Sequence, residues 1–195
     1  MSLTGRSGAG KTTLLHILAG LDRPSEGRVS VAGTDLGALA EADLARHRAR
    51  HVGVVFQALN LLNHLSVAEN VMLPAVFRRH ARTAAARRAL EALDRVGLAD
   101  RADDLPGTLS GGERQRVALA RAAFCTPDVL LCDEVTGNLD AATATEVVAL
   151  ILDLSRSDGV AVVAATHDPA LEEVSDRILV LSDGRLEAET EEGKA

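Results

Sequence analysis

Residues 5–13 read Gly5-Arg6-Ser7-Gly8-Ala9-Gly10-Lys11-Thr12-Thr13, the most informative stretch of this 195-residue chain. Its spacing is that of a phosphate-binding loop, in which glycines bring backbone N–H groups close to phosphate oxygens and the next helix points its N-terminus at the anion. Lys11 can reach the β- and γ-phosphates, and the Thr12 hydroxyl can ligate Mg²⁺. Apolar residues follow at helical spacing from Leu14 to Leu21, as such a loop requires. The stretch therefore predicts a nucleotide site with Mg²⁺.

The segment before this loop is short. Only Met1–Thr4 precede it, enough for about 13 Å of extended chain. Because a phosphate loop normally follows a buried strand, we expect this support to be partly missing.

Composition and charge exclude several kinds of protein. The formal charge of −7 argues against nucleic-acid binding through a basic surface, and no apolar run approaches the length of about 18 residues that a membrane span needs. Cys125 and Cys132 lack metal-ligand spacing, so we expect buried free thiols in a reducing compartment. Five arginines between Arg78 and Arg88 indicate a solvated helix face, with contact to anionic lipid headgroups as the alternative.

Apolar runs and helical patterns alternate in the chain. Val52–Phe56, Val129–Cys132 and Val160–Ala165 are runs typical of buried parallel strands. The segment between the first two runs is helical in character. We therefore expect a single α/β domain over residues 1–195, with a core formed by residues 1–57 and 126–195 and a helical subdomain at residues 58–125.

Two carboxylates follow the second of these apolar runs. Asp133 and Glu134 come directly after Val129–Cys132, and the C-terminal edge of a parallel sheet is where α/β proteins bind ligands. Asp133 can hold the hydration shell of Mg²⁺, while Glu134 can orient or deprotonate an attacking water. A surface pair that starts the next loop is the alternative, and the presence of a phosphate loop favours the catalytic interpretation.

The segment Leu109-Ser110-Gly111-Gly112-Glu113-Arg114-Gln115 opens another helix. Ser110 and Glu113 have the spacing of a capping box. Capping by itself requires neither glycine, and glycine destabilises a helix. We therefore expect Gly111 and Gly112 to leave the first-turn N–H groups open to an anion, which makes this segment a second phosphate site.

Taken together, these motifs resemble those of the ATPases of ATP-binding cassette (ABC) transporters. Leu109–Gln115 is similar to the signature motif of that family, and Gly5–Thr13 and Val129–Glu134 are similar to its Walker A and Walker B motifs. The other family motifs follow in order: Gln57 as the Q-loop, Gly137-Asn138-Leu139-Asp140 as the D-loop and His167 as the H-loop. The residues at 57–71 and 134–140 resemble the lipoprotein-releasing and macrolide-exporter branch.

The resemblance implies a fold and an activity. The fold would be that of a phosphate-loop NTPase, RecA-like, with a mostly parallel sheet and an inserted helical subdomain. The activity would be that of an ATPase motor subunit, in which two subunits pack head to tail and hold ATP between Walker A of one and the signature of the other. Mg²⁺ would accompany the nucleotide.

The resemblance also implies roles for individual residues. Glu134 would be the catalytic base, His167 would contact the γ-phosphate, and Gln57 would help to ligate Mg²⁺ together with Thr12 and Asp133. The remaining nucleotide contacts would come from the phosphate loop and from Ser110, Gly111, Gly112, Glu113 and Asp140.

Partners and location follow from the same resemblance. An integral membrane permease would contact the region Gln57–Leu73, a homodimer or paired cassette would form with ATP, and no nucleic acid would be bound. The protein would be cytoplasmic and peripheral on the inner face of the cell membrane.

The chain departs from the family pattern in two respects. Family members carry further residues before Walker A, with sheet strands and an aromatic side chain that stacks on adenine, whereas this chain has no Tyr or Trp. We therefore expect the first strands of the usual fold to be missing, and the strand at Arg28–Ala32 to lack its neighbours and expose apolar surface. Val135 also replaces the proline usual after the catalytic glutamate. The alternative function is a truncated, catalytically impaired cassette that acts as a binding or regulatory protein.

Overall fold

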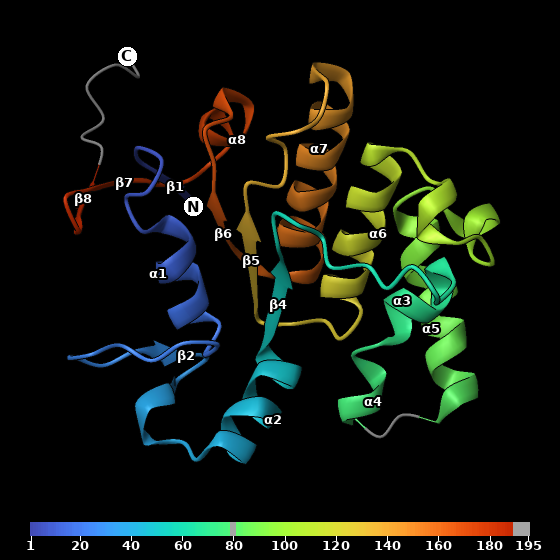
Figure 1. Ribbon diagram of the computed structural model, residues 1–195, viewed down its shortest axis with the longest axis horizontal. Helices are drawn as coiled ribbons and strands as arrows, with labels where there is room; N and C mark the ends of the chain where they lie inside the picture. The colour runs from blue at the N-terminus through green and yellow to red at the C-terminus, as the bar shows by residue number, and fades with distance from the viewer. Residues whose placement is uncertain (79–80, 189–195) are drawn as a thin grey trace.

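The computed structural model describes residues 1–78 and 81–188 of the chain (Figure 1). Its centre is a six-stranded sheet in the order β4–β5–β6–β1–β7–β8, in which every pair is parallel except β7 with β8. The strands are β1 (Ser2–Thr4), β4 (Val52–Val55), β5 (Val129–Asp133), β6 (Ala161–Ala165), β7 (Ile178–Ser182) and β8 (Arg185–Ala188). The prediction of a mostly parallel α/β sheet is confirmed.

The strand before the phosphate loop is present, contrary to our expectation. Ser2–Thr4 form β1 in the interior of the sheet, parallel to both β6 and β7. Ser2 and Leu3 are buried, and the Ser2 hydroxyl lies 2.7 Å from the hydroxyl of Ser175. Three residues suffice for this strand because it has a hydrogen-bonded neighbour on each side. The loop that starts at Gly5 therefore extends from an interior strand.

Helices cover both faces of the sheet (Figure 1). They are α1 (Lys11–Leu18) on one face and α6 (Gly111–Ala123) and α7 (Ala141–Asp158) on the other. Leu131 of β5 packs with Leu15 of α1, whereas Leu130 and Cys132 pack in the cluster under α6 and α7. This alternation follows because successive side chains of a strand point to opposite faces. Both cysteines are buried free thiols, as predicted, and burial raises the pKa of Cys132 to about 12.

A separate two-stranded sheet precedes β4. Its elements and their neighbours are β2 (Ser30–Val31), β3 (Thr34–Asp35), the 3-10 helix η1 (Leu36–Ala38) and α2 (Glu41–His51). The strand that we expected at Arg28–Ala32 is therefore only two residues long, and β3 is its antiparallel neighbour. Val31 is 7% exposed and packs with Leu36 and Leu44, so the expected apolar exposure is wrong for this side chain.

The chain between β4 and β5 forms helices with a buried cluster of their own. They are α3 (Val67–Met72), α4 (Ala75–Arg78), α5 (Arg82–Arg95), η2 (Ala99–Arg101), η3 (Pro106–Thr108) and α6. α6 links this cluster to the sheet, because its Val117 packs among the helices while the next residue, Ala118, packs in the cluster under the sheet. Among the described residues, no helix has both the length and the apolar character to cross a membrane.

Candidate nucleotide-binding site

The loop between β1 and α1 is shaped by glycine and leaves the start of the helix open. Gly5 has a φ of +139°, and a Cβ there would lie 2.3 Å from the backbone oxygen of Leu181 in β7. Gly10 precedes α1 in a left-handed conformation, and no side chain in this fully described stretch caps the first turn. The first turn also lacks an acidic residue. The partial positive charge of this helix terminus is therefore available to an anion.

Lys11 is buried and reaches across the loop. Its ammonium donates to the Gly5 carbonyl at 2.7 Å and to Nε2 of His167 at 3.0 Å. Because an ammonium group can only donate, Nε2 of His167 is the acceptor and the ring proton lies on Nδ1. The contact joins the phosphate loop to a residue that follows the end of β6.

The two carboxylates predicted at the end of β5 lie at this same edge of the sheet. Asp133 is 6% exposed. Glu134 has a φ of +48°, its N–H donates to the Ala165 carbonyl at 2.9 Å, and its Oε2 accepts from Nε2 of Gln57 at 2.9 Å. A left-handed conformation at a non-glycine residue costs roughly 1–3 kcal/mol. The bonds to Gln57 and Ala165 hold the Glu134 side chain and backbone in this conformation.

A cleft of about 590 Å³ opens beside Glu134 and His167. Its wall includes residues at the starts of α7 and α8 (Pro169–Glu173). Oγ1 of Thr166 accepts the N–H of Asp168 at 2.9 Å, and Asp168 caps α8 as the sequence predicts. His167 is thereby held between two fixed neighbours while its ring is exposed.

The start of α6 has the predicted capping box. Oγ of Ser110 accepts the Glu113 N–H at 3.2 Å, and Oε2 of Glu113 accepts the Ser110 N–H at 2.7 Å. A Cβ at Gly111 would meet no atom within 4 Å, whereas one at Gly112 would lie 2.3 Å from Cγ2 of Thr143 in α7. The expectation that both glycines exist to admit an anion is therefore incomplete, since helix packing already requires Gly112.

Asp140, predicted as a nucleotide contact, caps the start of α7. Its Oδ1 accepts the N–H groups of Ala142 and Thr143 at 3.1 and 3.0 Å, and its Oδ2 accepts the Thr143 hydroxyl at 2.7 Å. The bond from the Thr143 hydroxyl is the largest of the effects that hold the pKa of Asp140 below its usual range. Thr143 carries no sequence signal of its own, yet it touches both Asp140 and Gly112.

Arg121 of α6 is a second residue without a sequence signal. It donates to the backbone carbonyls of Asn60, at 2.7 Å, and Leu59. Both of these residues have positive φ values, 51° and 58°. Burial lowers the pKa of Arg121, because two carbonyls only partly replace the water that a guanidinium loses. α6 thus anchors the segment that follows Gln57.

The phosphate loop and the start of α6 do not meet within one chain. The structure describes residues 5–13 and 110–113 completely, and no hydrogen bond or ion pair joins these two segments. Their helices lie on opposite faces of the sheet (Figure 1). One chain therefore presents two separate helix starts that are open to an anion.

The fold and the site define a phosphate-loop nucleoside triphosphatase. The family described as ABC transporter matches residues 1–137. The lipoprotein-releasing system ATP-binding protein LolD of Chromohalobacter salexigens is 47% identical over 186 residues, which are 95% of this chain and 78% of LolD. The macrolide export ATP-binding/permease protein MacB of Rhodopirellula baltica is 43% identical over 189 residues, which are 94% of this chain and 27% of MacB.

A solved dimer of the ATP-binding cassette MJ0796, in a post-hydrolysis state bound to ADP and Pi, has the same fold. Its TM-score is 0.87 at 39% identity, over 96% of this chain and 84% of that one. The chain therefore belongs to the ABC transporter family. It is an ATP-binding and ATP-hydrolysing subunit, as its motifs imply.

Proposed function

We propose that the chain binds ATP at a composite site, with Gly5–Thr13 of one copy and Ser110–Gly112 of a second copy on either side of the nucleotide. The observation that carries this proposal is the separation of the two open helix starts within one chain. A second copy packed head to tail supplies each phosphate loop with the start of α6. The cassette MJ0796, which is 39% identical, is dimeric with ADP and Pi bound.

The proposed division of the chain follows from two of its hydrophobic clusters, one between the sheet and α6 and α7 and one among the helices of residues 67–125. Residues 1–57 and 126–195 form the ATP-binding core, and residues 58–125 form the helical subdomain that carries the signature. These ranges include residues 79–80 and 189–195, which lie outside the described residues. α6 belongs to both clusters, so it holds the signature at a fixed place relative to the sheet.

Glu134 is the proposed base for ATP hydrolysis. The bond from Gln57 fixes one of its carboxylate oxygens at the edge of the cleft. In the reaction Glu134 takes a proton from the attacking water, whose oxygen bonds to the γ-phosphorus while the bond to ADP breaks. We assign Lys11 and His167, which lie 3.0 Å apart, to binding of the γ-phosphate.

The donor set of the site fits Mg²⁺. Asp133 is buried at the end of β5 and has no ion-pair partner among the described residues, and buried carboxylates are normally paired or bound to a metal. The Thr12 hydroxyl, the Gln57 amide and the Asp133 carboxylate offer oxygen atoms, which are the ligands that Mg²⁺ prefers. We assign these three residues to a Mg²⁺ ion that neutralises the nucleotide phosphates.

The proposed partner outside the dimer is an integral membrane permease. The region Gln57–Leu73 contains the segment that Arg121 anchors, together with α3, and a permease helix docked there would contact the signature helix indirectly. LolD and MacB are described as parts of lipoprotein-releasing and macrolide-export systems. The proposed location is accordingly cytoplasmic, on the inner face of the cell membrane.

The substitution Glu134→Gln tests this function. Glutamine retains an oxygen that can accept from Gln57 but removes the base, so we expect ATP turnover to fall by about 100-fold or more. ATP-dependent dimers should then accumulate, because the bound nucleotide persists. Phosphate release and light scattering with Mg²⁺ and ATP measure the two effects.

The matched control is Glu91→Gln on α5. Glu91 is exposed, pairs with Arg87 at 3.7 Å and belongs to none of the motifs. We expect this variant to turn over ATP like the parent. Undiminished turnover in Glu134→Gln would overturn the assignment of the base, and a parent that stays monomeric with ATP would overturn the composite site.

A further inference from the structure

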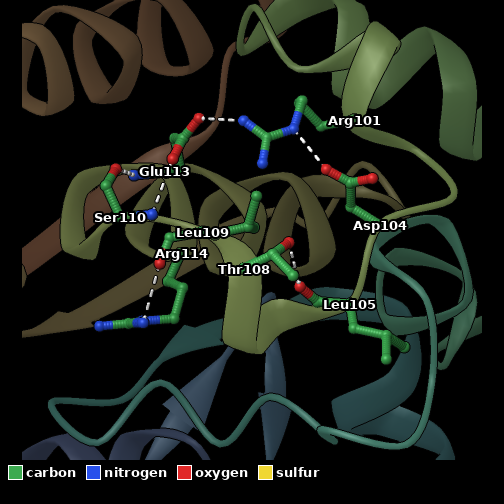
Figure 2. Close-up of polar contacts among 8 residues, drawn as sticks. All are labelled: Arg101, Asp104, Leu105, Thr108, Leu109, Ser110, Glu113 and Arg114. Carbon is green, nitrogen blue, oxygen red and sulfur yellow. Dashed lines mark hydrogen bonds and ion pairs between the residues drawn. The ribbon is translucent and has the colours of Figure 1, made fainter.

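Arg101, at the end of η2, contacts the start of α6 (Figure 2). Its Nη1 donates to Oε1 of Glu113 at 2.8 Å, and its Nε donates to Asp104. The side chains of Arg101 and Glu113 are 30% and 21% exposed, so this ion pair is partly shielded from water. No sequence motif predicts the contact.

Glu113 carries a negative charge in the first turn of α6. Its pKa lies below the usual range, chiefly because the Ser110 backbone donates to it, and the nearby Arg101 acts in the same direction. A carboxylate at this position repels a phosphate that approaches the same helix start. A cation bonded to Glu113 removes most of that repulsion.

The other nearby arginines are engaged elsewhere. Arg114 donates to the Leu109 carbonyl at 2.9 Å (Figure 2), and Arg116 donates to Glu146 at 2.7 Å. Within the described part of the chain, Arg101 is the guanidinium bonded to Glu113. The direct ion pair to the Glu113 carboxylate therefore comes from Arg101, while Arg116 acts on the pKa of Glu113 only through its charge.

We propose that Arg101 is a positioning residue for the ATP site, which neutralises Glu113 and holds it in the capping box so that the first turn of α6 accepts the phosphate carried by a second copy of the chain. The inference rests on the proposed composite site. It adds a requirement that the motifs do not contain, since it assigns a function to a residue outside them.

Arg101 also has a structural contact that the test must separate from this one. Through Asp104 it orders the turn at residues 102–104, whose carbonyls accept the N–H groups of Val67 and Ala68 at 2.8 Å each and so cap α3. Asp104→Asn removes the ion pair with the turn but leaves the bond from Arg101 to Glu113. It is the matched control for Arg101→Gln.

The experiment measures the ATP concentration for half-maximal dimerisation of the protein, in the Glu134→Gln background with Mg²⁺. We expect Arg101→Gln to raise this concentration on the order of fivefold, the effect that one partly buried ion pair supports. Asp104→Asn should leave it unchanged. The Glu113→Gln protein has no carboxylate at this position to neutralise. Adding Arg101→Gln to it should therefore shift the ATP concentration for half-maximal dimerisation by less than about twofold.

Two results would overturn the inference while leaving the composite site intact. One is an Arg101→Gln effect that is as large in the Glu113→Gln background as in the parent, and the other is the same effect from Asp104→Asn. If Arg101→Gln does not fold, Arg101→Lys keeps the charge beside Glu113, and a loss of ATP-dependent dimerisation in a folded Arg101→Lys protein would count against neutralisation. A parent that never dimerises with ATP overturns the proposed function and this inference with it.

Discussion

Gly112→Ala should strain the contact between α6 and α7 by an amount that the structure defines. The new Cβ would lie 2.3 Å from Cγ2 of Thr143, whereas carbon atoms in contact stay about 3.5–4.0 Å apart. Thr143 cannot rotate away without losing its 2.7 Å bond to Asp140. Overpacking of this kind costs about 1–3 kcal/mol, and the better helix propensity of alanine returns up to about 1 kcal/mol. We expect a net loss of about 1–2 kcal/mol in the free energy of unfolding.

A second substitution tests the assigned cause. Thr143→Ser removes the methyl group that would clash and retains the hydroxyl that bonds Asp140, so most of the lost stability should return in the double variant. Urea denaturation of the two single variants and the double variant measures the coupling. If Thr143→Ser fails to recover stability, or if Gly112→Ala unfolds like the parent, the packing explanation for Gly112 is refuted.

Gly111→Ala is the matched comparison, because it makes the same chemical change one residue earlier in the helix. A Cβ at Gly111 meets no atom within 4 Å, so the free energy of unfolding should stay level or rise slightly. The methyl group would instead occupy the space through which an anion reaches the first-turn N–H groups. We expect ATP-dependent dimerisation to weaken in Gly111→Ala without loss of stability, which separates the two glycines by function.

Two further predictions concern stability away from the ATP site. Gly53→Ala in β4 would place a Cβ 2.5 Å from the Ala122 backbone oxygen of α6. We expect the free energy of unfolding, measured by urea denaturation, to fall by about 2 kcal/mol or more. The control is Gly107→Ala, whose Cβ would meet no atom within 4 Å, and its stability should match that of the parent. Burial is the main cause that lowers the pKa of His47, so the folded protein disfavours protonation of this side chain. The free energy of unfolding should therefore be retained above pH 6.5 and decline as the pH falls from 6.5 through the pKa of His47 in the folded protein. His47→Leu should flatten this decline in urea titrations between about pH 7 and 5, and the exposed His64→Gln should not.

The parts of the fold that the sequence predicts are those with local causes. β5 follows from an uninterrupted apolar run, and both capping boxes follow from a serine and a glutamate three residues apart. β1 could not be predicted with the same rules, because three residues carry no periodicity. Its stability comes from β6 and β7, whose residues lie more than 150 positions away in the chain.

The residues of the site also fall into those that a local sequence pattern predicts and those that depend on contacts between distant parts of the chain. Motif spacing identifies Lys11 and Glu134, because each belongs to a short pattern with a chemical reason, whereas His167 follows only from the resemblance to the family. Thr143 and Arg101 belong to no pattern, since their partners lie on other elements and only the packed structure brings them together. The case of Gly112 shows why a motif can mislead: its chemistry explained both glycines equally well, and only the distance to α7 separates them.

α6 connects the parts of the site that chemistry must coordinate. Its first turn carries the signature, Gly112 packs on the helix that Asp140 caps, and Arg121 holds the segment after Gln57, whose amide bonds Glu134. Because a packed helix moves as a unit, a displacement of its start by a phosphate also displaces the backbone that Arg121 holds. We therefore expect the position of Gln57 relative to Glu134 to respond when an anion binds at the start of α6. This arrangement gives a physical reason for placing the permease contact on the chain just after Gln57.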